Sequence, residues 1–495
     1  MGEDDMKILG HIFKNNENAS LKYKAIRGSV QTVSGYGLTQ LLRLVSNVAL
    51  ARLLFPEAFG LMTLVMLFMQ GLAMFSDIGI LPSIIQNKRG NDRIFLDTAW
   101  TVQIVRGLML WLIASLCAVP FSIAYDQPML ADLIPWASLS ALIAGFNSTK
   151  LATENRHLNL GKLTVIDIVS QIMAIIVMCL WAFLSPEVWA LVAGGLSGTI
   201  TKLLLSHFWL EGRRNKLLLN SCALRSIFSF GKWIFISTLL HFLAGQSDKL
   251  IFGKLITIEA LGVYSIAVIL ANAPFHAISQ LSSKIIFPYF CKVRQQAGIS
   301  PKIYGLVSYL YTYIGTLVAL LTYIGGPLII QSLYDERYHG AMDLVQLIVI
   351  GKWFEVVLGN LRGAALLAYS KAHWNSIGSA VKLVVIGFFV IPAFRQYGFH
   401  AAVLVYALAE CGRYMVFVYA NQLVDVRGAS REALTTLLAF SVIGSVEWFV
   451  SFLVSSGLQE NYVRLIICAG FSLLWIVILF GLYKFYQRRE DKIWV

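Results

Sequence analysis

Charged residues are scarce in this chain. Only 14% of its 495 residues are Asp, Glu, Lys or Arg, and 57% are hydrophobic. A soluble protein has roughly 25% charged and 45–50% apolar residues, so this composition excludes a soluble globular protein. The six cysteines are scattered and form no CxxC pair. They are expected to be small buried hydrophobic residues, because a disulfide framework or a cysteine-bound metal needs paired spacing.

Catalytic motifs are also missing. The sequence has no DxD, HExxH or Walker A motif, and its longest predicted outside loop, about 331–340, is short. A membrane enzyme such as a polymerase or glycosyltransferase would need larger loops with catalytic clusters. The sequence therefore predicts a transporter without a cofactor. Its energy would come from an H⁺ or Na⁺ gradient, the membrane potential or the substrate gradient.

Apolar blocks of about twenty residues dominate what is present. This length crosses the roughly 30 Å of hydrocarbon in a bilayer. The pattern predicts an all-α polytopic membrane protein with about 14 transmembrane helices, at 27–51, 59–85, 95–119, 131–152, 163–184, 188–210, 227–251, 260–286, 303–330, 341–367, 375–394, 399–421, 433–455 and 463–483.

Lysine and arginine are unevenly divided between the two sides of this map. With a cytoplasmic N-terminus, 24 of them fall on the inside, and five fall outside or at an outer span edge: Arg52, Lys254, Arg337, Arg395 and Arg464. This bias follows the positive-inside rule and predicts that both termini are cytoplasmic. Topology and anionic lipid thus explain the net charge of +13, and no nucleic-acid partner is expected.

An internal repeat recurs at an offset of 202 residues. The stretch RLLFPEAFG at 52–60 aligns with KLITIEALG at 254–262, at the ends of the first and seventh spans. Both copies lie on the same side of the membrane, so the repeat is parallel, and transporters often bind substrate between such repeats. The predicted parts are a cytoplasmic N-terminal segment (1–26), an N-lobe (27–210), a basic linker (211–226), a C-lobe (227–422), two extra helices (423–483) and a cytoplasmic tail (484–495).

Three short motifs resemble those of a known family. They are the basic-Leu-x-x-x-Glu-Ala-x-Gly turn at 52–60 with its repeat, FSDIGILPSIIQNK at 75–88, and DTAWTVQIVRG at 97–107. On these residues the chain resembles the Wzx-type polysaccharide flippases of the MOP superfamily (MATE transporters and oligosaccharide flippases), and most of all their colanic-acid-exporter-like branch. The resemblance covers nearly the whole chain and is firmest over 35–110.

The resemblance implies a two-lobed flippase with a central cavity. Such proteins pass undecaprenyl-diphosphate-linked oligosaccharides across the bacterial inner membrane by alternating access, for the synthesis of exopolysaccharide, O-antigen or capsule. Its partners would be that lipid-linked substrate and membrane lipid. A polysaccharide polymerase and a chain-length regulator are further candidate partners. A multidrug exporter of the same superfamily and a lipid II flippase remain alternatives.

Ionisable residues inside the predicted spans are the candidate functional residues. At a helix centre each costs about 2.5–3.5 kcal/mol on insertion scales, so most are expected to face water, a partner or the interface. They are Arg43, Asp77, Arg106, Asp167, His241, Asp248, Lys249, Lys284, Lys352, Glu355, Arg362, Lys382, Glu410, Arg413 and Glu447.

Helical spacing groups some of them with amides. Asn272, His276, Gln280 and Lys284 recur every four residues and predict one polar stripe. Gln40, Arg43 and Asn47 form another in the first span. In the second span, Gln70 is the repeat mate of Asn272. The resemblance implies that spans 1, 2, 7 and 8 line the cavity, and these are the spans that carry the stripes.

Roles follow from the chemistry of the expected cargo. Its pyrophosphate needs fixed cations, for which Arg43 and Lys249 are candidates. Its sugars need amides, and the substrate-binding candidates are completed by Gln40, Asn47, Gln70, Asn272 and Gln280. A carboxylate or imidazole must titrate or bind sodium in an ion-coupled cycle, and the candidates for this are Asp77, Asp248 and His276.

Structural roles compete with these functional ones. Asp248 and Lys249 could be interfacial or locally paired, and Asp77 could cap or bend a helix. The spacing of Lys352 with Glu355, and of Glu410 with Arg413, favours structural ion pairs. Glycines spaced as GxxxG at 194/198 and 359/363 indicate close helix packing.

Overall fold

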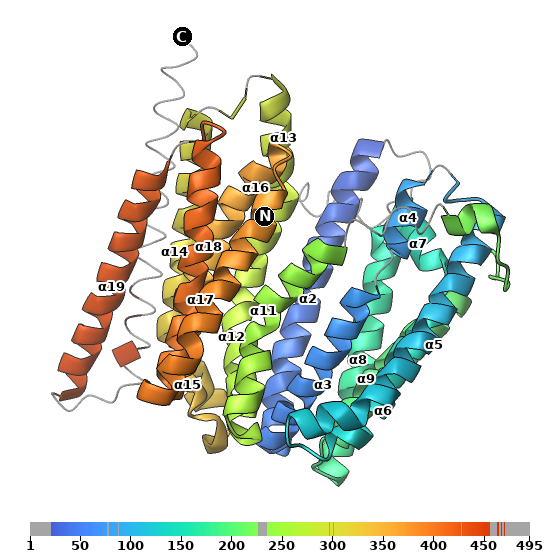
Figure 1. The fold of residues 1–495 in the computed structure, drawn as a ribbon, viewed down its shortest axis with the longest axis horizontal. Helices are drawn as coiled ribbons and strands as arrows, with labels where there is room; N and C mark the ends of the chain where they lie inside the picture. The colour runs from blue at the N-terminus through green and yellow to red at the C-terminus, as the bar shows by residue number, and fades with distance from the viewer. Residues whose placement is uncertain are drawn as a thin grey trace, which may run out of the picture. The chain divides into compact units, whose positions relative to one another are not determined.

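The structure is a computed structural model that describes most of the chain. The described residues are 21–76, 79–87, 89–157, 159–225, 235–296, 298–299, 301–426, 428–455 and the single positions 463, 464, 467 and 470. Over these residues every regular element is helical (Figure 1). The prediction of an all-α membrane protein is confirmed. The last predicted span, 463–483, and both tails lie largely or wholly outside the described residues.

The chain divides into two compact units, residues 1–239 and 240–495. The first contains α2 (Leu21–Leu53), α3 (Pro56–Phe75), α4 (Ile80–Gln86), α5 (Arg93–Ala124), α6 (Leu130–Gly145), α7 (Lys150–Arg156), α8 (Leu160–Leu184) and α9 (Trp189–Phe208). The division falls inside α11 (Phe235–Leu255).

The second unit continues from α11 with α12 and the helices that follow it. Its elements are α12 (Ile258–Leu281), the π-helix η1 (Ser282–Ile286), α13 (Phe287–Gln296), α14 (Pro301–Leu333), the 3₁₀ turn η2 (Glu336–Tyr338), α15 (Ala341–Lys352), the π-helix η3 (Trp353–Gly359), α16 (Asn360–Ala368), α17 (His373–Tyr397), α18 (Phe399–Gln422) and α19 (Ala429–Ser455).

Nine helices of the described part are long and apolar enough to cross a membrane, or ten if the bent pair α6 and α7 forms one span. The first thirteen predicted spans each fall on one of the helices, or on a consecutive run of them. The total of fourteen stays a prediction.

The 202-residue repeat appears in the helix boundaries. Helix α2 ends at Leu53 and α3 begins at Pro56, while α11 ends at Leu255 and α12 begins at Ile258. Both boundaries are shifted by 202 residues. Pro56 starts α3 with its fixed backbone angle, whereas the Thr257 hydroxyl caps α12 by accepting from the Ala260 N–H at 3.2 Å. Different local chemistry thus builds the same turn.

The second and fourth helices of each unit are interrupted. In the first unit Gly79, at φ 68°, separates α3 from α4, and α6 meets α7 at an angle of 61°. The predicted spans at 59–85 and 131–152 therefore each cover two helices with a break between them. In the second unit the equivalent helices stay continuous but contain η1 and η3. Such π-helical turns are rare and release backbone hydrogen bonds locally.

Polar side chains link the two π-helical regions. The Asn360 amide donates to the Ser279 hydroxyl at 3.0 Å, and the Ser282 hydroxyl donates to the Asn360 carbonyl at 3.1 Å. The Tyr311 hydroxyl of α14 lies within hydrogen-bond distance of the Ile278 and Val356 carbonyls, at 3.2 and 3.1 Å. Protein hydroxyl groups thus lie within hydrogen-bond distance of backbone carbonyls at these irregular turns, which suits a membrane interior.

Glycine permits close contact between helices α8 and α9 in the first unit. A Cβ atom at Gly194 of α9 would lie 2.8 Å from the Ala174 carbonyl oxygen of α8, and one at Gly198 would lie 3.1 Å from the Ser170 carbonyl oxygen. The close packing predicted from the 194/198 spacing is confirmed. At Gly363 the nearest atoms are 3.7 Å away, so the 359/363 pair makes no comparable helix contact there.

Candidate functional site

Arg43 is exposed on α2, in the same helix as Gln40 and Asn47. The Ser46 hydroxyl and the Asn47 amide both donate to the backbone carbonyl of Arg43, each at 2.9 Å. Asn47 is therefore partly engaged by its own helix, whereas the Arg43 guanidinium projects from an exposed position. Gln40 is half-buried beside it.

The predicted stripe on α12 lies on a face that is not buried in the unit. His276 and the following Lys284 of η1 are exposed, and Asn272 and Gln280 are half-buried. Gln70 is exposed at the equivalent place on α3. Each of the two units thus presents amide side chains from its second helix, as the repeat predicted.

Lys249 and Asp248 occupy different environments although they are neighbours on α11. The Lys249 ammonium donates to the Gln246 side-chain oxygen at 2.6 Å, so it has a local partner. Asp248 is buried, at 4% exposure. Its Oδ2 accepts from the Tyr264 hydroxyl of α12 at 2.9 Å. Asp77 and the His241 side chain lie outside the described residues, so their predicted roles stay predictions.

Ion pairs lie on α17 and α18 and at the junction of α15 with η3, and the pair between α17 and α18 is buried. Lys382 donates from its ammonium to Glu410 Oε1 at 2.6 Å, and both side chains are 4% exposed. Arg413 lies 3.6 Å from the other oxygen of Glu410, and Lys352 pairs with Glu355 at 2.5 Å. The two ion pairs predicted from i, i+3 spacing are confirmed. Lys382 as the main partner of Glu410 was not predicted.

A second buried cluster surrounds Glu432 at the start of α19. Arg362 donates from Nε to Glu432 Oε2 at 2.7 Å, and the Tyr414 hydroxyl donates to the same oxygen at 2.6 Å. Tyr304 donates to Oε1 at 2.8 Å. The Arg362 and Glu432 side chains are each 1% exposed. The cluster joins α14, α16, α18 and α19.

Other intramembrane charges also have partners on neighbouring helices. The Arg106 guanidinium donates to the Ser76 hydroxyl at 3.0 Å and to the Ala73 carbonyl at 2.8 Å, where α3 ends. Lys202 pairs with Asp167 at 2.7 Å. Glu447 accepts from Arg464 at 3.2 Å. Single-sequence spacing could not reveal these pairs, because their members lie 17 to 35 residues apart.

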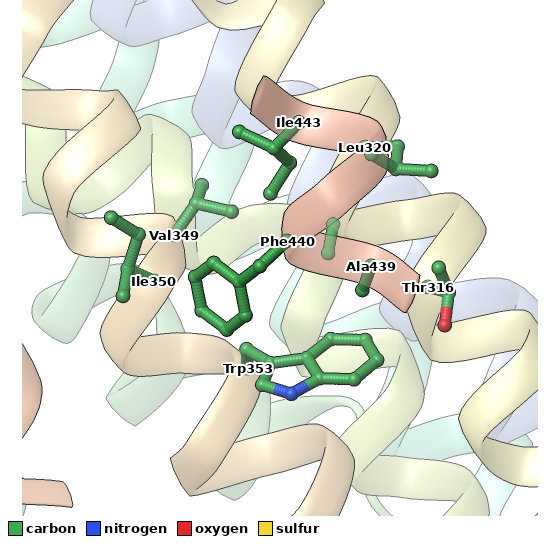
Figure 2. Close-up of a pocket in the computed structure, with 9 residues that line it drawn as sticks. Thr316, Leu320, Val349, Ile350, Trp353, Ala439, Phe440 and Ile443 are labelled. Atoms are coloured by element: carbon green, nitrogen blue, oxygen red, sulfur yellow. The ribbon is translucent and has the colours of Figure 1, made fainter. Parts of the chain in front are cut away.

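A small apolar pocket marks where α19 packs on α14 and α15 (Figure 2). Its free volume of about 10 Å³ holds at most one water molecule. The lining side chains include Leu320, Val349, Trp353 and Phe440, and the indole N–H of Trp353 donates to the Thr436 hydroxyl at 3.2 Å. This pocket is a packing contact and is too small for a sugar.

No group of three or more His, Cys, Asp or Glu side chains within the described part of the chain could hold a metal ion. The polar side chains of α2, α3 and α12 provide amides and a guanidinium, which suit hydrogen bonding to sugar hydroxyls and to phosphate. Each unit by itself therefore offers side chains that could bind a polar cargo, and the exposed guanidinium of Arg43 belongs to the first unit.

Comparisons with known proteins identify the family of the chain. The model of the family described as "Polysaccharide biosynthesis protein" matches residues 49–343, more than half of the chain. The chain is 21% identical to the teichuronic acid biosynthesis protein TuaB of Bacillus subtilis, over 84% of this chain and 86% of that protein. It is 22% identical to the lipopolysaccharide biosynthesis protein WzxC of Escherichia coli, over 71% of each.

Solved structures show the same fold. The inward closed conformation of the lipid II flippase MurJ superposes with a TM-score of 0.71 at 12% identity, covering 92% of this chain and 99% of that one. Multidrug transporters of the MOP superfamily share the fold as well. The resemblance drawn from the three sequence motifs is confirmed, as is a transporter rather than an enzyme. The chain belongs to the polysaccharide biosynthesis protein family and has the fold of the MOP superfamily transporters.

Proposed function

We propose that this protein is a flippase for undecaprenyl-diphosphate-linked oligosaccharide repeat units. It resides in the bacterial inner membrane with both termini in the cytoplasm and works by alternating access between its two units. Family membership is the observation that carries the proposal, because the matched relatives are named for the biosynthesis of teichuronic acid and lipopolysaccharide. An H⁺ or Na⁺ gradient drives the cycle, and a polymerase and a chain-length regulator act on the exported units.

The contrast between buried, paired charges and an exposed arginine supports this cargo. Buried ionisable groups of the second unit, such as Arg362 and Lys382, are held by carboxylates within that unit. Arg43 of the first unit is exposed. Because a planar guanidinium can bind a phosphate with two parallel hydrogen bonds, Arg43 is the residue proposed to hold the pyrophosphate.

Replacing Arg43 tests the assignment. A strain lacking the gene, complemented with Arg43→Ala, is expected to export surface polysaccharide roughly ten- to a hundredfold more slowly, since a hydrogen bond to a charged group contributes about 1.5–3 kcal/mol. Arg43→Lys keeps the positive charge but removes the planar guanidinium. Export by this variant therefore shows whether the charge alone is sufficient or the two parallel hydrogen bonds are needed. The readout is polymer per cell, normalised to the amount of the protein in the membrane.

Arg52→Ala is the matched control, because Arg52 is another exposed arginine at the end of the same helix. It should leave export unchanged. Wild-type export by Arg43→Ala would remove Arg43 from the site. Normal surface polymer in the deletion strain, together with drug resistance on overexpression, would instead identify a multidrug exporter.

A further inference from the structure

Part of the basic linker, residues 213–220, is fastened to α5 as an extended chain. It contains no helix, and three of its backbone N–H groups donate to side chains of the DTAWT motif at the start of α5. The pairs are Lys216 with Asp97 at 3.0 Å, Leu218 with the Thr101 hydroxyl at 2.9 Å, and Asn220 with the Thr98 hydroxyl at 3.2 Å. Every second residue thus donates toward α5, as in a β-strand.

Asn215 fastens the same segment to the break between α6 and α7. Its Oδ1 accepts from the Ser148 hydroxyl at 3.0 Å and from the Thr149 N–H at 3.2 Å, and its Nδ2 donates to the Thr149 hydroxyl at 2.7 Å. The polar groups that could hold the segment in water are therefore turned toward the first unit. Its leucine and basic side chains are left on the outside.

Three consecutive leucines of the segment are exposed. Leu217, Leu218 and Leu219 have 71%, 41% and 62% of their surface accessible. The most exposed two, Leu217 and Leu219, share one face of an extended chain. Phe208 and Trp209, where α9 ends, are also exposed. A run of exposed apolar residues in water is unfavourable and marks an interaction surface.

Three cations flank these leucines. Arg213, Arg214 and Lys216 are exposed, and none of them takes part in an ion pair among the described residues of the first unit. The carboxylate of Glu211 lies 3.9 Å from Lys162 instead. Basic and apolar side chains exposed side by side are typical of a segment that lies in the interface of an anionic membrane.

The lengths of the adjoining helices place the segment at the depth of the lipid headgroups. Helix α9, with 20 residues, is about 30 Å long and just crosses the hydrocarbon, so Trp209 follows at its boundary. Helix α5, with 32 residues, is about 48 Å long, and about 18 Å of it lies outside the hydrocarbon. The linker is bonded to the first turns of α5, roughly 6–12 Å from its start.

We infer that residues 208–219 form an anchor for anionic phospholipid. Arg213, Arg214 and Lys216 bind lipid phosphates, while Leu217 and Leu219 enter the outer acyl region. An acidic soluble protein could reach the cations but not leucines at this depth. Because α5 and Asn215 already hold the backbone, little ordering is needed when lipid binds. On the predicted topology the anchor fixes the depth of the first unit at the cytoplasmic leaflet, whatever cargo the protein carries.

Quenching of a fluorophore by brominated lipids tests the anchor in the full chain. Cys222 is exposed two residues after Asn220, so it can carry the fluorophore once the other cysteines are replaced by alanine. In nanodiscs, phosphatidylglycerol with brominated acyl chains should quench several-fold more strongly than brominated phosphatidylcholine at the same mole fraction. Added salt should weaken this preference, because it screens exposed charges.

Neutralising the cations should weaken the preference for phosphatidylglycerol. Arg213→Gln, Arg214→Gln and Lys216→Gln should each lower it about fivefold, the effect of one basic residue near an anionic surface. Arg395→Gln is the matched control, since Arg395 is an exposed arginine at the end of α17, on the predicted outer side. It should leave the preference unchanged. Leu217→Ser combined with Leu219→Ser should reduce quenching by both lipids.

Equal quenching by the two lipids in wild type would overturn the inference, as would an unchanged preference in all three cation variants. Unaltered quenching in the double leucine variant would place the segment outside the bilayer and also contradict it. Displacement of phosphatidylglycerol by inorganic phosphate at constant ionic strength would identify a site for soluble anions instead. The flippase proposal is independent of these results, because the deletion phenotype and Arg43 test it.

Discussion

At the scale of single residues, Arg362 illustrates what burial demands of a charge. Its side chain is 1% exposed, and its charge is balanced by one carboxylate, Glu432, with the rings of Tyr304 and Tyr414 beside it at 5.6 and 5.9 Å. Desolvation makes such a pair nearly neutral in stability when intact and strongly destabilising when one member is removed. Arg362 of α16 therefore links α16 to α19 through its ion pair with Glu432.

Arg362→Met is expected to lower the free energy of unfolding by about 3–5 kcal/mol, because it leaves Glu432 buried without a cation. The measurement is denaturant unfolding of the purified protein in detergent. The double variant Arg362→Met with Glu432→Leu should recover most of that loss. A double variant as unstable as the single one would show that the residues act through packing.

Residue spacing predicted the local ion pairs and missed the distant ones. Lys352 and Glu355 lie one helical turn apart, so their pairing could be read from the sequence. Lys382 and Glu410 lie 28 residues apart on two helices. Nothing in one sequence states which faces of those helices meet. The substrate-binding candidates are placed on exposed or half-buried helix positions, and their roles await the Arg43 experiment.

At the scale of helices, hydropathy located the elements but not their interruptions. A π-helical turn such as η3 keeps the apolar composition of the span around it, and the break at Gly79 occupies only a few residues. A window of about twenty residues averages over such features. The GxxxG spacing indicated close helix packing correctly at 194/198 but not at 359/363, because the same spacing occurs whether or not a neighbouring helix lies against that face.

Gly194→Val should destabilise the packing of α9 on α8, because its Cβ would lie 2.8 Å from the Ala174 carbonyl oxygen, a backbone atom that cannot move aside cheaply. Overpacking of this kind costs typically about 1–3 kcal/mol. The thermal unfolding midpoint in detergent should fall. Gly195→Ala is the control, since nothing lies within 4 Å of a Cβ there. Equal midpoints for the two variants would contradict the packing argument.

At the scale of the whole chain, the basic segments that connect the helices contact one another or a neighbouring helix start within each unit. Arg89 lies 3.8 Å from Cys222, and the Lys216 N–H donates to Asp97 at 3.0 Å, which joins the linker to the start of α5. In the second unit the Ile299 N–H donates to the Tyr369 hydroxyl at 3.2 Å. Segments predicted to share the cytoplasmic side thus contact one another within each unit.

Reporter fusions can test the predicted topology. A phosphatase that is active only outside the cytoplasm should be active when inserted at Glu336 and inactive when inserted at Asn215 or fused after Val495. This pattern follows from the positive-inside distribution. Phosphatase activity at Asn215 would place the linker outside and invert the assignment.

The interrupted helices carry a mechanical consequence. In the first unit Arg156 of α7 donates to the Ile84, Ile85 and Asn87 carbonyls at the end of α4, at 2.6–2.8 Å. In the second unit Arg294 of α13 donates to the Ala368 carbonyl that ends α16. In both units, an arginine of one helix tail is thus hydrogen-bonded to carbonyls at the end of the neighbouring helix tail. Because these hydrogen bonds tie the two tails together, we expect both tails of a pair to move together when either helix bends at its interruption.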